Sequence, residues 1–198
     1  MLEPRRSRYT LLGPGGGVAG HEDLAIDRDA NGWVVNTEVA AGAPWDLTAR
    51  VTWHLGDRLE TRVLAIATRN GFGEGHEVEL AFTGNGVLAH RRGPDGPSQI
   101  ELGWGPRAEV DYLSAVFSEV TLRRLAARHV VEEDVECLSI DAETLEPVVV
   151  TRRYRRLADS AWACEVAATS HHARLMQDGA GVLVEYEGLF RLDGASPA

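Results

Sequence analysis

The chain has 198 residues, of which 44% are hydrophobic and 25% are charged, and its formal net charge is −10. These proportions are typical of a globular protein, and the length is that of one domain, so we expect one domain over 1–198 with an ordered core at about 6–192. The negative charge disfavours nucleic acid and anionic membrane surfaces as partners, because both attract basic patches.

Targeting signals and cysteines restrict the class of protein further. The N-terminal stretch Met1 to Arg6 lacks the apolar run of a signal peptide, and no window is apolar enough to span a membrane. Cys137 and Cys164 lie in apolar strand patterns, which favours buried free thiols over a disulfide framework or a metal site. We therefore expect a cytoplasmic protein without stable membrane insertion; the pattern leaves the oligomeric state and the distance between the two cysteines open.

The seven histidines do not form a metal-binding motif. They are scattered along the chain, and no HExxH or CxxC sequence accompanies them. His171 and His172 are adjacent, so in a strand their side chains point to opposite faces and do not grip one ion together. We expect no metal and no cofactor.

The first half of the chain alternates between apolar and polar residues, which is typical of strands. Alternating stretches lie at 8–12, 21–27 and 33–39, with an Asn31-Gly32 hairpin turn before the third. The clearest strand is 46–55, in which one face carries Leu47, Ala49, Val51, Trp53 and Leu55. Further strands joined by turn residues are expected at 59–68, 77–82, 87–91 and 99–104.

The pattern changes after residue 108. The stretch 109–128 has no glycine or proline, and Leu113, Val116, Phe117 and Val120 recur at helical spacing. This predicts a helix within 114–127, with Asp111 or Ser114 as its N-cap. Strands resume at 134–140, 147–157, 161–168 and 173–177, and the Asp-Gly-Ala-Gly turn at 178–181 leads to a closing strand at 182–186.

Many strands with one apolar face and a single helix predict a mainly β fold. Such an antiparallel sheet must curve strongly on itself into a barrel or half-barrel, with the helix near 114–127 plugging it. Several of the residues expected to point inward are small: Ala49, Ala65, Ala81, Ala163 and Ala167. Small inward residues favour a cavity, although the same alanines are also compatible with direct packing against the helix.

Three stretches of the chain resemble the bacterial "putative glycolipid-binding" family: Val110-Asp111-Tyr112, Phe117-Ser118 and Leu122-Arg123-Arg124-Leu125. The sequence VTRRYRRL at 150–157 is similar to the family's aromatic-bearing strand, residues 178–186 are similar to its closing hairpin, and Gly20-His21-Glu22 is similar to its early Gly-Glu. Ser118 and Thr121 stand where the family carries Asn and Pro, and Trp53 and Trp104 match its Trp-containing middle loosely. The resemblance implies a curved half-barrel, similar to lipoprotein carriers, around an apolar cavity that holds a lipid-like ligand.

Seven residues are candidates for contacting such a ligand. Trp53 and Trp104 end alternating apolar faces near a turn, where a barrel mouth would lie, although a core position is equally typical of tryptophan. Asp111, beside Tyr112, either caps the helix or hydrogen-bonds a ligand headgroup. The set is completed by Glu22, Tyr154 and Tyr186, with solvated or simply packed side chains as the alternative readings.

Three functions fit these expectations. The first is non-catalytic binding of a lipid-like or glycolipid-like amphipathic molecule in the cavity. The second is an enzyme, a hydrolase or cyclase acting on an apolar substrate in the same cavity, which requires converging polar groups and one carboxylate shifted towards neutrality. The third is an interaction module with a filled barrel, which requires an exposed apolar patch. The sequence points to no catalytic residue.

Overall fold

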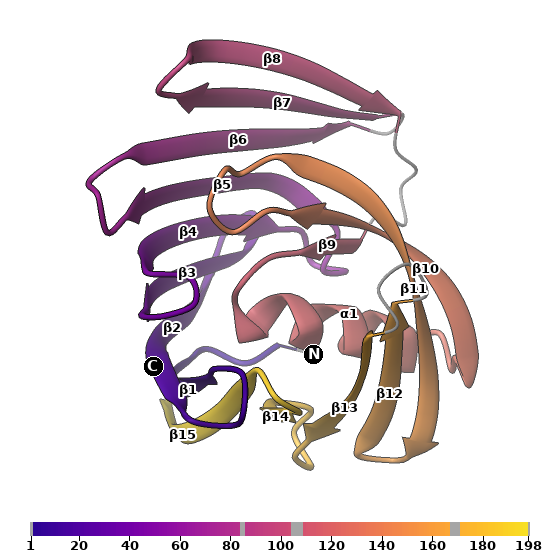
Figure 1. Cartoon of the computed structure of the whole chain (residues 1–198). Coiled ribbons are helices and arrows are strands. Elements are labelled where there is room, and N and C mark those ends of the chain that lie inside the picture. Colours follow the sequence, from indigo (N-terminus) through magenta and orange to yellow (C-terminus); the bar gives the residue numbers. More distant parts are fainter. Residues whose placement is uncertain (1, 84–85, 104–108, 167–170, 198) are drawn as a thin grey trace.

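The computed structural model describes residues 2–83, 86–103, 109–166 and 171–197. In this part of the chain, fifteen strands form a single curved sheet, and the sheet wraps around one helix (Figure 1). The elements are β1 (Arg5–Leu12), β2 (Val18–Asp29), β3 (Gly32–Ala41), β4 (Leu47–Leu55), β5 (Thr61–Asn70), β6 (Gly75–Thr83), β7 (Gly86–Gly93), β8 (Gly96–Gly103), β9 (Glu109–Asp111), α1 (Ala115–Ala127), β10 (Glu132–Ile140), β11 (Pro147–Ala158), β12 (Ala161–Val166), β13 (His171–Gln177), β14 (Leu183–Tyr186) and β15 (Phe190–Pro197).

The sheet is a meander that does not close. Its order is β8-β7-β6-β5-β4-β3-β2-β1-β15-β14-β13-β12-β11-β10-β9, so strands that follow one another in sequence are mostly neighbours in space. The pair formed by β1 and β15 departs from this rule, and β9, although it is next to β10, runs parallel to it. The mainly β fold, with a strongly curved antiparallel sheet and a helix inside it, is confirmed.

Strand β15 joins the two halves of the sheet, and it lies entirely beyond the last predicted strand, which ends at residue 186. Its register with β1 runs from Leu11 opposite Phe190 to Arg5 opposite Pro197. Between β13 and β15, β14 contributes only four residues. The pairing of β1 with β15 therefore connects the half formed by β1 to β8 to the half formed by β9 to β15.

Local sequence explains most of the strands. In β4 the predicted alternation is present, since Leu47, Ala49, Val51, Trp53 and Leu55 are buried and the residues between them are exposed or half-buried. At the start of β3, Gly32 takes a φ of 136°, and the Asn31 backbone N–H donates a hydrogen bond to the Asp29 carboxylate. Asn-Gly thus makes the hairpin between β2 and β3, because glycine tolerates the positive φ that the turn requires.

The helix lies on the concave side of the sheet, where most of its surface is buried. Ala115 to Leu122 and Leu125 are all buried, and the ring of Phe117 stacks on Trp53 of β4 with centroids 4.5 Å apart. Ser114 occupies the N-cap position, yet its side chain does not cap the helix. That function belongs to Glu22 of β2, whose Oε2 accepts the Ala115 backbone N–H at 2.9 Å.

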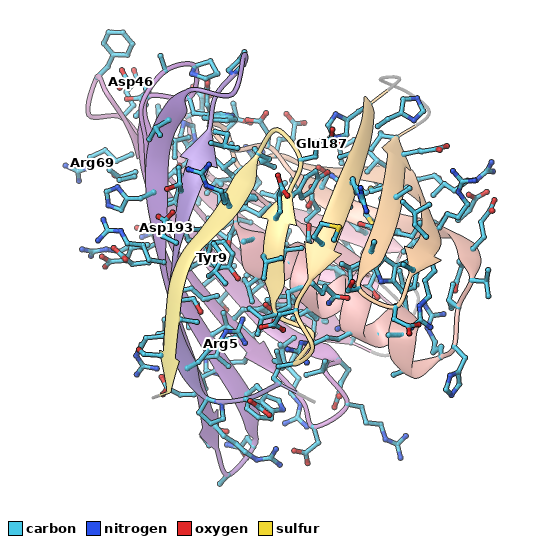
Figure 2. All side chains as sticks on the ribbon, turned by 90° about the horizontal axis from the view of Figure 1, so that it is seen from below. Arg5, Tyr9, Asp46, Arg69, Glu187 and Asp193 are labelled. Carbon is cyan, nitrogen blue, oxygen red and sulfur yellow. The ribbon has the colours of Figure 1, made fainter. Side chains whose placement is uncertain are left out.

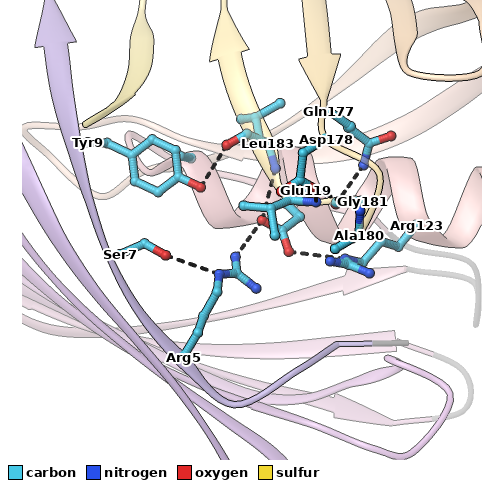
Figure 3. Close-up of polar contacts among 12 residues, drawn as sticks. Arg5, Ser7, Tyr9, Glu119, Arg123, Gln177, Asp178, Ala180, Gly181 and Leu183 are labelled. Carbon is cyan, nitrogen blue, oxygen red and sulfur yellow. Dashed lines mark hydrogen bonds and ion pairs between the residues drawn. The ribbon is translucent and has the colours of Figure 1, made fainter. Parts of the chain in front are cut away.

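Two further buried glutamates attach the helix to the sheet. The Oε2 of Glu119 accepts hydrogen bonds from Nη2 of Arg5 at 2.6 Å and from the Leu183 backbone N–H at 3.2 Å. Its Oε1 accepts a hydrogen bond from Nε of Arg123 at 3.0 Å (Figure 3). Near the other end of the helix, Glu109 accepts from Arg124 at 2.8 Å. The helix is therefore held by polar contacts along its length as well as by apolar packing.

Some of the small residues predicted to point inward instead face outward. Ala65 lies between the fully buried Leu64 and Ile66, so its side chain is on the convex face, and Ala81 and Ala163 pair across the sheet with outward-facing neighbours. Ala49 does point inward, while Ala167 lies outside the described residues. Figure 2 shows Arg5 and Tyr9 turned towards the helix and Arg69 projecting away from it. The period of two fixes which residues share a face but leaves open which face is inside.

Glu22 provides a test of the buried cap. Burial raises the pKa of its carboxyl above the ordinary value of 4.5, against the opposing effect of hydrogen bonds from Ser114, Ala115 and Thr37. A raised pKa means that the folded state binds more protons than the unfolded chain above pH 4.5, so the free energy of unfolding falls as pH rises through the window between the two pKa values. Relative to Glu22→Gln, which does not titrate, the wild type should lose stability as the pH rises above 4.5. Urea unfolding of both proteins measures this difference, and a constant difference would contradict the buried carboxyl.

Candidate functional site

A pocket of about 360 Å³ opens at the end of the barrel where α1 begins. Its walls come from the half of the sheet formed by β9 to β15, from the helix and from the loop between β3 and β4. Among the lining residues, Ser118, Arg152, Tyr186 and Phe190 are buried and form the floor. Trp45, Val150 and Leu189 are half-buried and form an apolar rim, beside which His171 is exposed.

An ion pair between Asp111 and Arg152 provides the charged groups of this pocket. Nη2 of Arg152 donates to Oδ2 of Asp111, and the two side chains are 10% and 22% exposed, respectively. Burial raises the pKa of the Asp111 carboxyl, although the Arg152 guanidinium and the Ser139 hydroxyl act in the opposite direction. Nε of Arg152 is buried without a hydrogen-bond partner, so this guanidinium retains unused donor capacity.

A second polar contact lies on the adjacent wall. The Tyr186 hydroxyl is 3.3 Å from Nε2 of His171, and the Tyr186 ring packs edge-on against Phe190 at 6.5 Å. Burial raises the pKa of the Tyr186 hydroxyl, so it remains a protonated hydrogen-bonding group. The pocket thus combines aromatic walls with an ion pair and four hydroxyl-bearing side chains, those of Tyr112, Ser118, Ser139 and Tyr186. Such an arrangement is typical of sites that orient a small molecule.

The structure brings three of the seven predicted ligand residues together in this pocket: Asp111, Tyr112 and Tyr186. Trp53 is 1% exposed and packs in the core against Phe117, and Glu22 caps the helix, so both make structural contacts away from the pocket. Tyr154 is buried on β11, two residues beyond Arg152, and does not line the pocket. Trp104 lies outside the described residues.

Sequence reasoning missed Arg152, the cation of the pocket. Alternating arginines in a strand, as at 152–156, usually form a solvated face, and this holds for Arg153 and Arg155. Arg152, however, is two residues from Tyr154 and therefore shares its buried face. That spacing from an aromatic residue was the available signal. Trp45 and His171 had no comparable signal, because loops and pairing across the sheet place them there.

A larger hollow of about 800 Å³ lies on the convex face of the sheet, over β1, β2, β3 and β15. Its walls include Arg8 and Asp23, whose side chains are each 55% exposed and form an ion pair at 3.7 Å. Contacts between a ligand and side chains that are this well solvated contribute little binding energy, because water screens charges at the surface. The smaller pocket at the helix is therefore the better candidate site.

Both cysteines are buried and free, as the sequence predicted. Cys137 is on β10 and Cys164 on β12, and β11 lies between these strands. Strands are about 4.8 Å apart, so residues two strands apart are beyond the Cα separation of a disulfide. Over the residues that the structure describes, no group of three His, Cys, Asp or Glu could hold a metal ion. In the same residues, no helix has the length and hydropathy needed to cross a bilayer.

Comparison with known proteins places this geometry in a family. The model of the family described as "Putative glycolipid-binding" matches residues 15–192, a range that includes every residue lining the pocket. The chain belongs to this family. Membership of the glycolipid-binding family supports a binding role in general for this protein. The resemblance that the sequence indicated is confirmed.

Two solved structures share the fold. One is a DUF1089 family protein from Pseudomonas aeruginosa, 18% identical, with a TM-score of 0.62 over 86% of this chain and 91% of that one. The other is a beta-barrel-like protein of the domain of unknown function DUF1849 from Brucella abortus, 10% identical, with a TM-score of 0.63 over 100% of this chain and 98% of that one. At these sequence identities, the two structures show only that they share the fold of this chain. No curated protein matches the chain in sequence.

Proposed function

We propose that the protein binds one lipid-like or glycolipid-like amphipathic molecule in the pocket at the start of α1, without catalysing a reaction on it. The observation that carries this proposal is a pocket with an apolar aromatic rim and a buried polar floor, made by Trp45, Val150 and Leu189 above Arg152 and Tyr186. Such a site matches a molecule with one polar and one apolar end. Membership of the family supports the same conclusion.

The size of the pocket limits the ligand. A volume of about 360 Å³ lies near the lower end of the range of about 300–1,000 Å³ taken by small-molecule sites. This space suits a headgroup with part of a single acyl chain better than a two-chain lipid held in full. Each CH₂ group buried against the rim contributes about 0.8 kcal/mol, so a few contacts suffice for measurable affinity.

Filling the pocket from one wall tests the proposal. Val150 lines the pocket on β11, whereas its neighbour Val149 is 47% exposed and lies outside it. Val150→Trp should lower the affinity for monodecanoylglycerol by about tenfold or more, because the added ring occupies the site. Val149→Trp adds the same ring outside the pocket and should leave the affinity unchanged.

Calorimetric titration of the wild type and the two variants provides the measurement, supported by native mass spectrometry of the gently isolated protein to detect retained lipid. Equal affinities in all three proteins would place the ligand elsewhere. A wild type that neither retains nor takes up any amphiphile would remove the proposed function.

A second candidate function is hydrolysis of an ester or glycoside in the same pocket. It is favoured by the convergence of Asp111, Arg152, His171 and Tyr186, and by the raised pKa of Asp111, since a carboxyl with a raised pKa suits acid–base catalysis. Turnover of chromogenic esters or glycosides that is lost in Asp111→Asn would support this candidate, whereas binding without turnover would leave the carrier function. The third function, an interaction module, requires an exposed apolar patch. The large exposed apolar side chains lie on separate segments, among them Val18, Phe72 and Val149, so they give this function less support.

A further inference from the structure

The charges of the pocket point to the kind of headgroup it accepts. Asp111 and Arg152 are the carboxylate and the guanidinium that line it, and each neutralises the other in direct contact. His171 stands at the exposed rim, where water solvates it. At the floor, therefore, the paired charges sum to zero, and the cation there already has an anionic partner.

An anionic ligand would enter this site at a disadvantage. A carboxylate or phosphate loses its water of hydration in the pocket, and that loss is offset only by a cation free to pair with it. Arg152 is held by Asp111, whose own negative charge would repel the newcomer. A cationic ligand meets the opposite obstacle, because Asp111 is held by Arg152.

A neutral polar group meets no such obstacle. Arg152 has N–H donors besides the one that it gives to Asp111, the Tyr186 hydroxyl is bonded at 3.3 Å to the exposed His171, and Ser118 adds another hydroxyl to the lining. These groups can exchange hydrogen bonds with carbonyl or hydroxyl oxygens without any change in net charge. The half-buried rim of Trp45, Val150 and Leu189 then contacts the apolar part of the molecule.

We infer that the pocket selects uncharged amphiphiles, with a polar end rich in ester, carbonyl or hydroxyl oxygens that lies against Arg152 and Tyr186, and that it discriminates against fatty-acid carboxylates and lipid phosphates. The Asp111–Arg152 pair is the specificity determinant, because it removes the free positive charge that an anion requires. This inference rests on the proposed function and names the class of ligand for the same site.

The test compares two probes with the same acyl chain, monodecanoylglycerol and decanoate, by calorimetric titration. The wild type should bind the neutral ester at least about tenfold more tightly than the carboxylate. Asp111→Asn keeps the shape of the side chain but leaves the charge of Arg152 unpaired, so the preference should shift towards decanoate by about tenfold or more. The matched control is Asp134→Asn, which removes a carboxylate from the exposed pair with Arg153, next to Arg152 on the opposite face of β11, and should leave the preference unchanged.

Each outcome decides the matter. Equal or tighter binding of decanoate by the wild type overturns the inference while leaving the proposed binding function in place. An unchanged preference in Asp111→Asn also overturns it, since the pair would then not set the specificity. Binding of neither probe removes the proposed function as well. Should Asp111→Asn fail to fold, the preference of the wild type alone supports or overturns the inference.

Discussion

Glu119→Gln is expected to lower the free energy of unfolding by about 3–5 kcal/mol, because it leaves buried cations without their anion. Glu119 is fully buried and pairs with both Arg5 and Arg123, whose side chains are 6% and 9% exposed. It also accepts the Leu183 backbone N–H, so one carboxylate joins β1, α1 and β14. The loss of charge therefore affects three elements at once, and urea unfolding followed by circular dichroism measures it.

A surface pair provides the control for this prediction. Glu38 pairs with Arg50 at 3.1 Å, but the two side chains are 70% and 81% exposed, so Glu38→Gln should change stability by less than about 1 kcal/mol. Combining Glu119→Gln with Arg5→Met should recover part of the loss, because the second change removes the unpaired cation. Similar stabilities for Glu119→Gln and Glu38→Gln would show that the buried pair contributes little.

Trp53→Ala is the second large expected effect, a loss of about 3–5 kcal/mol in the free energy of unfolding. The Trp53 side chain is 1% exposed and stacks on Phe117 at an interplanar angle of 22°, so its removal leaves a cavity between the sheet and the helix. Phe72→Ala deletes another aromatic ring, but one that is 93% exposed, and should change stability by less than about 0.5 kcal/mol. Thermal unfolding of both variants gives the comparison.

The same residue separates a core role from a ligand role. The sequence marked Trp53 as a ligand contact, whereas the structure places it away from the pocket. Trp53→Phe, which keeps an aromatic ring in the core, should therefore retain the affinity of the wild type for monodecanoylglycerol. A loss of affinity in a well-folded Trp53→Phe variant would return Trp53 to the binding site.

Local patterns predicted the elements because they depend on neighbouring residues. The alternation in β4 and the helical spacing of Val116, Phe117 and Val120 both follow from burial of one face, and both are found in the structure. Ser114 was predicted as a cap from its position and residue type, and it does occupy the N-cap position. The capping group, however, comes from Glu22, far away in sequence, and local propensity cannot show a partner of that kind.

The site was predictable only in part, for the same reason. Asp111 and Tyr112 stood out because they separate a strand from a helix, and Tyr186 because it lies in an alternating strand. Arg152 meets Asp111 only after β9 has paired beside β10 and β11 has paired on the other side. Its burial depends on that ion pair, and a charged side chain without a visible partner is normally assigned to the surface. The pocket is thus a product of tertiary pairing more than of any single motif.

The pairing of β1 with β15 has a consequence for how the chain folds. Nearly all other strands pair with their sequence neighbours, so each half of the sheet can grow by local hairpins at low contact order. Arg5 and Pro197, by contrast, meet across almost the entire sequence, and closing so long a loop carries a large entropic penalty before any contact forms. We expect the union of β1 with β15 to be the late, rate-limiting event, and the barrel end that holds the pocket to be completed only with it.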